Sequence, residues 1–228
     1  MIKNALVLGS TKGIGKAFLE ALILNGYQAS PLGRNQIDTT SEESVDSFLT
    51  NTVNNSYDFL VLNAGGLKPI SEQASVDEMI SSIEEAKISF FESQIKLLLK
   101  LNLNPKSTVV FISSHVVHNI EPRLISSAVA RAATEKFLEY LSHFERYKDS
   151  TFISLRFGPI LTDRLNNLLI SNKSSQEELA KSIFQERISN TEDVKSLANL
   201  IITSRSLFGS GTYSFDSGIS QIKSGLSL

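Results

Sequence analysis

The feature that most restricts the fold of this 228-residue chain is a regular alternation of short apolar runs with longer amphipathic segments. The apolar runs have the length of β-strands and are predicted as strands over 4–9, 27–32, 57–63, 108–113, 151–156 and 211–216. Helical periodicity predicts helices over 13–26, about 40–53, about 76–101, 126–147, about 175–187 and 191–204. Strands and helices that alternate in this way form right-handed crossovers and a parallel sheet covered on both faces. The sequence therefore predicts a doubly wound α/β fold.

Composition indicates one domain over residues 1–228 and excludes several classes of function. Hydrophobic residues make up 41% of the chain, and no linker, charge block or repeat divides it. The net charge of −2, with dispersed basic residues, argues against nucleic-acid binding. No cysteine is present, which excludes disulfides and thiolate metal sites and is compatible with a cytoplasmic location. The apolar runs are too short to cross a membrane, and the N-terminus is typical of a first strand rather than a signal peptide.

A glycine-rich loop, GSTKGIG, joins the first predicted strand to the first predicted helix. Its glycines, Gly9, Gly13 and Gly15, permit a tight turn and a close approach of the backbone to a phosphate group. The N-terminus of the following helix then offers unpaired N–H groups to the anion. In a parallel sheet of this kind, ligands bind beyond the carboxyl ends of the strands. We therefore expect the chemistry to lie after Leu8, Leu62, Ser113 and Arg156.

The spacing G-x-x-x-G-x-G resembles that of the short-chain dehydrogenase/reductase family, whose fold is Rossmann-like. The resemblance continues in LNAGG (62–66), FISSH (111–115), RFGPILTD (156–163) and FDSG (215–218). In the third of these, Phe157 replaces the family's proline and Thr162 is retained. The resemblance implies a dinucleotide site formed by Gly9, Ser10, Thr11, Lys12, Gly13, Ile14, Gly15, Asn63, Ala64, Gly65 and Thr162.

The residues after the second predicted strand favour NADP(H) over NAD(H). A 2′-phosphate needs a cation where NAD sites usually place an acid. Arg34 supplies that cation, Gly33 leaves space, Lys12 adds charge, and no acid competes. By resemblance, Asp38 contacts adenine. Only three residues separate Arg34 from Asp38, so the helix that the family usually has there is expected to be missing.

The catalytic positions implied by the resemblance are mostly changed. The family uses a serine, a tyrosine thirteen residues later, a lysine four residues after that, and an asparagine 28 residues before the serine. Counting from Ser114 places these positions at Ser127, Arg131 and Ala86. Arg131 keeps a positive charge that suits ribose hydroxyls, but serine is a far weaker acid than tyrosine. Since a positioned general acid contributes about 10²–10⁴-fold in rate, the ordinary ketone-reductase mechanism is not available.

His115 and His118 follow Ser114 on a loop that lines the substrate pocket in this family. One hypothesis is that either histidine replaces the missing proton donor, since histidine titrates in the right range. With Glu121 they also have a metal-like spacing. The simpler interpretation, which we favour, is that they are polar loop residues and that the protein holds no metal.

Three functions stay open. The first is an NADP(H)-dependent oxidoreductase for a small carbonyl or hydroxyl substrate, with an impaired or modified mechanism and a lid over 163–190. The second is a pseudoenzyme: a non-catalytic NADP(H) sensor or an inactive subunit of a hetero-oligomer. The third, a scaffold that binds no dinucleotide, is disfavoured by the glycine loop and Asn63. The resemblance also implies a homo-oligomer, a dimer or tetramer, packed through the two long helices.

Overall fold

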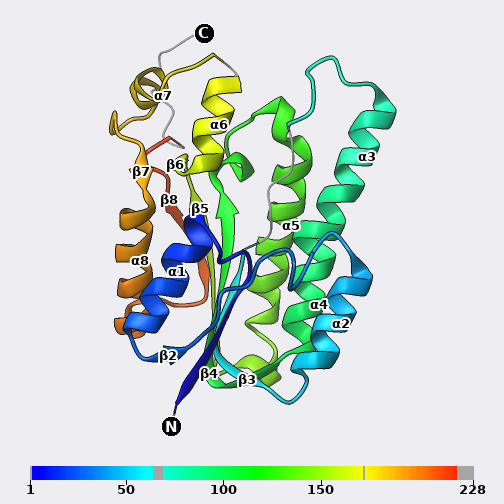
Figure 1. The fold of residues 1–228 in the computed structure, drawn as a ribbon, viewed down its shortest axis with the longest axis vertical. Helices are drawn as coiled ribbons and strands as arrows, with labels where there is room; N and C mark the ends of the chain where they lie inside the picture. Colours follow the sequence, from blue (N-terminus) through cyan, green and yellow to red (C-terminus); the bar gives the residue numbers. More distant parts are fainter. Residues whose placement is uncertain (1, 64–68, 172, 220–228) are drawn as a thin grey trace.

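The computed structural model describes residues 2–63, 69–171 and 173–219. In this part of the chain, six parallel strands form one sheet in the order β2-β1-β3-β4-β5-β8 (Figure 1). The strands are β1 (Lys3–Val7), β2 (Tyr27–Gln28), β3 (Ser56–Leu62), β4 (Asn102–Ser114), β5 (Thr151–Phe157) and β8 (Gly211–Phe215). A separate parallel pair joins β6 (Ile160–Leu161) to β7 (Ser189–Asn190). This confirms the predicted Rossmann-like α/β fold.

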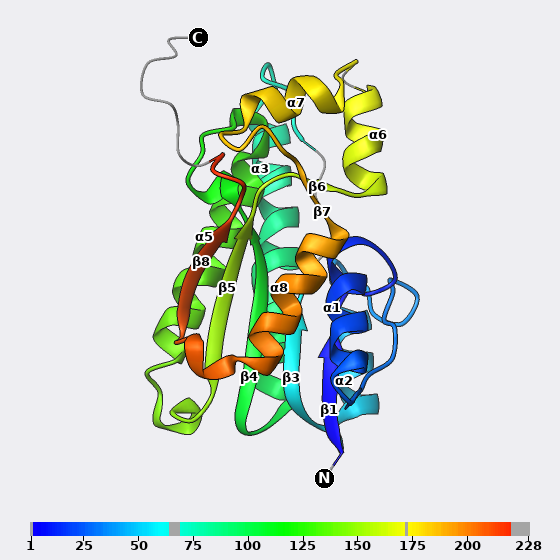
Figure 2. The ribbon, with the colours of Figure 1, turned by 90° about the vertical axis from the view of Figure 1, so that its left-hand side faces the viewer.

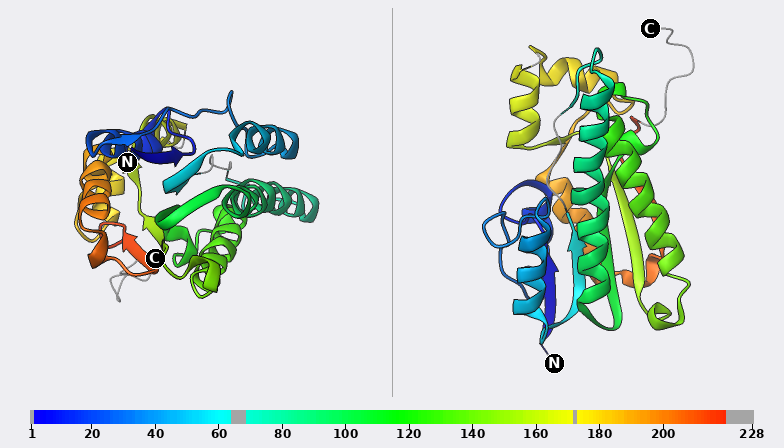
Figure 3. Two further views of the ribbon diagram at one scale, coloured as in Figure 1. Left: turned by 90° about the horizontal axis from the view of Figure 1, so that it is seen from below. Right: turned by 90° about the vertical axis from the view of Figure 1, so that its right-hand side faces the viewer.

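Helices cover both faces of the sheet (Figures 1 and 3). One face carries α1 (Gly13–Leu24) and α8 (Thr191–Thr203), and the other carries α2 (Glu42–Thr52), α3 (Val76–Ala86), α4 (Ser93–Lys100) and α5 (Ile125–Leu141). Successive side chains of a strand point to opposite faces. Val110 and Ile112 of β4 accordingly join the core beneath α1 and α8, while Val109 and Phe111 join the core beneath α4 and α5.

The long helix predicted over 76–101 is interrupted in its middle. A π-helical turn, Lys87–Glu92, lies between α3 and α4. A π turn adds one residue to a single turn of the helix. The turns on either side keep the hydrophobic period of an α-helix, so the sequence pattern does not reveal the insertion. Such turns are frequent near functional sites, and this one begins directly after Ala86.

Several other predicted boundaries are wrong. The second strand ends at Gln28, β4 begins earlier at Asn102, and α5 ends at Leu141 before a separate 3₁₀ turn. The N-cap of α2 is Ser41, whose hydroxyl accepts from the Ser44 amide, and not Thr40. The Thr40 hydroxyl donates to Asp38 instead.

The segment 163–190 lies above the carboxyl ends of the strands and contains α6 (Asp163–Ser171) and α7 (Gln176–Ser182) (Figure 2). The sequence did not predict α6. Between Arg34 and Asp38 the chain forms turns and no helix, as expected. None of the described helices combines the length and the apolar character that a membrane span needs.

Candidate functional site

A cleft of about 930 Å³ lies at the carboxyl ends of the central strands. The glycine loop, the carboxyl end of β4, the residues after β3 and β5, and helix α6 all contribute to its wall. Asn63, Ser114 and Gly158 mark the ends of the three strands. The predicted strand ends therefore meet at one site.

The glycine loop is tightly packed against the end of β3. Gly9 and Gly13 both have a φ of +59°, a conformation that glycine adopts without strain. A Cβ atom on Gly15 would lie 2.3 Å from the carbonyl oxygen of Gly9. The Asn63 amide donates to the carbonyls of Leu8 and Gly9 at 3.2 and 3.3 Å. Glycine at these positions and asparagine at 63 thus set the shape of the loop.

The loop leaves the N-terminus of α1 without a side-chain cap. Lys12 is the N-cap residue, and its side chain accepts no hydrogen bond from the first turn. Unpaired N–H groups and the helix dipole favour an anion at such a terminus. Lys12 and Arg34 line the same cleft and add positive charge to it. The arrangement is suited to the phosphates of a nucleotide.

The predicted cofactor residues do not all face the cleft. Those that line it are Lys12, Gly13, Ile14, Arg34, Asn63, Arg131 and Thr162. The Ser10 side chain is buried instead, and its hydroxyl accepts from the Leu32 amide at 2.8 Å. Thr11 lies against Gly33, where a Cβ atom would come within 2.9 Å of the Thr11 methyl group. Ala64 and Gly65 lie outside the described residues.

The expectation that no acid competes for Arg34 is wrong. Asp38 Oδ2 lies 3.9 Å from Arg34 Nε. Asp38 also accepts from the Thr40 amide and hydroxyl at 3.0 and 2.7 Å, and these bonds lower the pKa of its carboxyl group. The Arg34 side chain is 74% exposed, so its ion pair is weak and an incoming phosphate can replace Asp38.

Arg131 is oriented by three contacts within the fold. Its Nε donates to the Ser127 hydroxyl at 3.2 Å, and its Nη1 donates to the Ile112 carbonyl at 2.5 Å. The guanidinium also stacks on the Phe90 ring, 4.3 Å from its centroid. Burial lowers the pKa of Arg131 to about 10, with a further contribution from the charge of Arg164. Arg131 is therefore a fixed cation at neutral pH.

The other two changed positions offer no acid to the cleft. Ser127 is not among the residues that line it, and its hydroxyl is used by Arg131. Ala86 is fully buried and packs with Phe90 and Ala130. An apolar cluster thus occupies the place where the resemblance implies an asparagine.

Ser114 lines the cleft, and its oxygen is contacted from the adjoining turn. The Val116 amide donates to Ser114 Oγ at 3.5 Å, and His115 Nδ1 lies 3.4 Å from it. The same His115 nitrogen lies 3.3 Å from the Phe157 carbonyl, to which only an Nδ1–H can donate. Burial lowers the pKa of His115 and keeps it neutral at pH 7. In this tautomer Nδ1 carries a hydrogen and cannot accept one, so the Ser114 hydroxyl does not donate to His115.

Neither His115 nor His118 is among the residues that line the cleft. His118 is exposed, and its Nε2 contacts Arg156 Nη1. Among the described residues, no group of three acidic or histidine side chains is arranged to hold a metal ion. His115, His118 and Glu121 are therefore not brought together as such a group.

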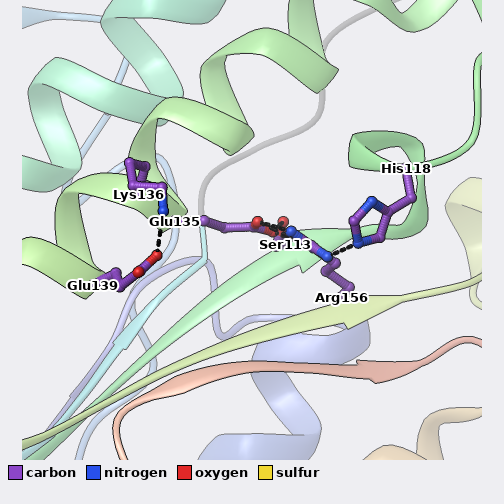
Figure 4. Close-up of polar contacts among 6 residues, drawn as sticks. All are labelled: Ser113, His118, Glu135, Lys136, Glu139 and Arg156. Atoms are coloured by element: carbon purple, nitrogen blue, oxygen red, sulfur yellow. Dashed lines mark hydrogen bonds and ion pairs between the residues drawn. The ribbon is translucent and has the colours of Figure 1, made fainter.

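A buried ionic network that the sequence did not reveal includes Ser113, the residue that precedes Ser114 (Figure 4). Ser113 Oγ donates to Glu135 at 2.5 Å, and Arg156 Nε lies 2.9 and 3.1 Å from the two Glu135 oxygens. Glu135 follows Arg131 by one helical turn, so the two side chains share the face of α5 that meets the sheet. The sequence did offer a signal for this network, because Glu135 stands in a predicted helix and Arg156 in a predicted buried strand, where an unpaired charge is costly.

Comparison with solved structures identifies relatives of this fold. A short-chain dehydrogenase family protein from Francisella tularensis subsp. tularensis SCHU S4 superimposes with a TM-score of 0.83 at 22% identity, over 97% of this chain and 100% of that one. A small-chain dehydrogenase in complex with NADPH gives a TM-score of 0.81 at 16% identity, over 97% of this chain and all of the other. The chain therefore has the fold of short-chain dehydrogenases/reductases, and its structural neighbours across its whole length include members of that family.

The same fold occurs in a protein described as ribose-5-phosphate isomerase from Brucella melitensis 16M, with a TM-score of 0.82 at 16% identity, over 98% of this chain and 94% of that one. The fold alone therefore does not determine the reaction. No family model matches the sequence. No curated protein matches it.

Proposed function

We propose that the protein is an NADP(H)-binding oxidoreductase of the short-chain type, which acts on a small carbonyl or hydroxyl substrate with an altered catalytic set. The observation that carries this proposal is the joint geometry of the glycine loop and Asn63. A Cβ atom on Gly15 would lie 2.3 Å from the Gly9 carbonyl oxygen, so this tight turn requires glycine there, and the N-terminus of α1 has no side-chain cap. Both features suit a bound pyrophosphate.

The preference for NADP(H) rests on two cations. Lys12 and Arg34 line the cleft at the glycine loop and after β2, and a 2′-phosphate there gains charge-assisted hydrogen bonds from them. The nearby Asp38 is already held by Thr40 and leaves Arg34 exposed. The NADPH complex of the structural neighbour lends support, since that protein shares the fold.

Titration of nicotinamide fluorescence with NADPH and NADH tests this preference. The wild type is expected to bind NADPH at least tenfold more tightly than NADH, and Arg34→Gln is expected to reduce that ratio mainly by weakening NADPH. Arg187→Gln, which removes an exposed arginine paired with Asp193, is the matched control. A ratio that is unchanged in Arg34→Gln contradicts the assignment.

The bound cofactor would supply hydride to a carbonyl carbon, and the protein's own residues must then stabilise the resulting oxygen. The Ser114 hydroxyl is the donor available at the cleft, because its oxygen already accepts from the Val116 amide. Arg131 contributes a fixed positive charge. Since Ser127 and Ala86 supply neither an acid nor a water site, turnover is expected to be slow.

Restoring the family's residues at positions 86, 127 and 131 tests how much of the expected loss of activity is due to these positions. The variant Ala86→Asn/Ser127→Tyr/Arg131→Lys is expected to gain ketone reductase activity, measured as NADPH oxidation. Ala86→Asn/Ser127→Phe/Arg131→Lys, which differs from the triple variant only in lacking the phenol oxygen, is the control. A triple variant that binds NADPH but stays inactive contradicts the view that the remaining pocket is competent.

The second candidate function is a non-catalytic NADP(H)-binding sensor or an inactive subunit of a hetero-oligomer. The burial of Ala86 in an apolar cluster favours it, as does the use of the Ser127 hydroxyl by Arg131. This candidate predicts NADPH binding without any oxidation of NADPH by the wild type across ketones, aldehydes and oxo acids.

A further inference from the structure

A hollow of about 840 Å³ adjoins the cleft at the carboxyl ends of the strands. Pro69, Arg164 and Leu168 line both spaces, so the two spaces meet at these residues. The volume of the hollow lies within the range of about 300–1,000 Å³ that is typical of small-molecule sites. A ligand bound in the cleft can therefore extend into the hollow.

The walls of the hollow are braced by hydrogen bonds within the fold. On one side, the Ile70 amide donates to the Arg123 carbonyl at 3.0 Å and joins the segment before α3 to the turn before α5. On the other side, Gln176 Nε2 donates to Asn166 Oδ1 at 2.9 Å and joins α7 to α6. The protein itself therefore fixes both walls, so a ligand does not have to order them.

The wall of the hollow is largely aliphatic, and no aromatic side chain is among its described lining residues. Six half-buried residues supply most of the apolar surface, and they are Ile70, Leu124, Leu165, Leu168, Leu169 and Leu179. A hydrocarbon chain in the hollow would remove this surface from water, which is favourable in proportion to the area covered.

The charged residues of the hollow already have partners. Arg123 Nε lies 2.9 Å from Glu121 and 3.9 Å from Glu72, and these three side chains are at least 38% exposed. Arg164 also has an interaction within the chain. An ionic group on a ligand would lose its hydration in the hollow without gaining a new partner. The hollow therefore favours a neutral chain.

We infer that the substrate is a neutral aliphatic ketone or aldehyde, or the corresponding alcohol, whose hydrocarbon chain occupies the hollow. The inference rests on the proposed function for the reaction. In that reaction the carbonyl carbon gains a hydride from NADPH, the carbonyl oxygen gains a proton from water, and NADPH becomes NADP⁺. The carbonyl lies beside Ser114 in the cleft, and the chain extends past Leu168 toward Leu169.

Calorimetric titration of the wild type with ketones, without cofactor and with NADP⁺, tests the inference. A ketone does not react with NADP⁺, so binding is measured without turnover. From 2-butanone to 2-octanone, each added CH₂ is expected to tighten binding by up to about fourfold. In 7-oxooctanoate a carboxylate replaces the terminal methyl group of 2-octanone, and this ketone is expected to bind at least about tenfold more weakly.

Two results overturn the inference. One is an affinity that does not depend on the length of the ketone, because a chain in the hollow must gain from each added CH₂. The other is binding of 7-oxooctanoate as tight as that of 2-octanone, because the hollow would then not select a neutral chain. Both comparisons use only the wild type, so they do not depend on whether any variant folds.

A pair of neighbouring residues on α6 locates the chain. Leu169→Asn places an amide in the wall of the hollow and is expected to weaken 2-octanone at least about fivefold, with NADPH affinity within about twofold. Leu169→Ile is expected to retain most of the affinity. Ile170→Asn is the matched control, since Ile170 is 75% exposed and is not among the described residues that line either space. Equal effects of the two asparagine variants overturn the proposed location.

The two proposals fail in distinguishable ways. Binding of 2-octanone that depends on chain length, without any binding of NADPH, removes the proposed function and leaves the hydrocarbon site in place. Binding of NADPH, without ketone binding that depends on chain length, removes the hydrocarbon site and leaves the proposed function.

Discussion

At the scale of single residues, the burial of His115 makes the stability of the protein depend on pH. Its Nδ1 lies between Ser114 and the Phe157 carbonyl, and burial lowers its pKa below the ordinary value of 6.5. In the unfolded chain the imidazole titrates normally. Between the folded pKa and 6.5, the unfolded state therefore binds more protons than the folded state, and the free energy of unfolding falls as the pH falls.

We predict that His115→Asn removes this dependence. Asparagine retains an N–H donor for the Phe157 carbonyl and does not titrate. Urea unfolding of the two proteins at pH 7.5 and at pH 5 is expected to show a larger loss of stability on acidification in the wild type. Other titrating groups are common to both proteins and cancel in the comparison. Equal losses would show that His115 is not buried as neutral imidazole.

Counting along the chain assigns positions but not their environments. Counting from Ser114 assigned the family's catalytic positions to Ser127, Arg131 and Ala86, and of these three residues Arg131 lines the cleft. The stacking of Arg131 on Phe90 and the burial of Ser10 depend on residues distant in sequence. Spacing carries no information about such contacts.

At the scale of elements, the pair of Glu135 on α5 and Arg156 on β5 connects a helix to the sheet. Their side chains are 6% and 15% exposed, so removal of one leaves the other charged and largely without solvent. We predict that Glu135→Gln lowers the free energy of unfolding by about 3–5 kcal/mol. Equilibrium urea unfolding measures the change.

Two controls define this prediction. Glu139→Gln, which breaks the exposed pair with Lys136 on the same helix (Figure 4), is expected to have little effect. The double variant Glu135→Leu/Arg156→Leu is expected to recover much of the loss, because no buried charge is left unpaired. A Glu135→Gln variant as stable as Glu139→Gln would contradict the network.

An element was predictable from the sequence where one hydrophobic period, that of a strand or that of a helix, runs through its whole length. Buried strands and amphipathic helices gave all six strands of the main sheet and most of the helices. The pattern does not show the π turn after Ala86, where the period shifts for one turn only. It also missed α6, a short helix whose apolar residues Leu165, Leu168 and Leu169 line a hollow rather than the core.

At the scale of the whole molecule, exposed apolar side chains gather on α3 and α5, which lie side by side (Figures 1 and 3). They include Ile80 and Ile83 on α3 and Ile125 and Val129 on α5, each at least 39% exposed. A patch of this kind on neighbouring helices favours a protein–protein contact. We propose that a second copy of the chain covers these helices in a homo-oligomer.

We predict that the wild type is a dimer or tetramer by light scattering coupled to size exclusion, and that Val129→Asp shifts it toward the monomer. A buried carboxylate at the interface would be costly. Leu207→Asp introduces the same charge at a residue that is 72% exposed in another part of the molecule, and it should leave the assembly unchanged. A monomeric wild type would contradict the proposed interface.

The central claim is that the cleft binds a dinucleotide although the family's acid–base residues are changed. Titration with NADPH, followed by nicotinamide fluorescence, tests it most directly, with Gly15→Ala as the paired variant. The account predicts micromolar binding by the wild type and at least a tenfold loss in the variant, since its Cβ displaces the Gly9 carbonyl and deforms the phosphate loop. The absence of NADPH binding by a folded wild type would contradict the account.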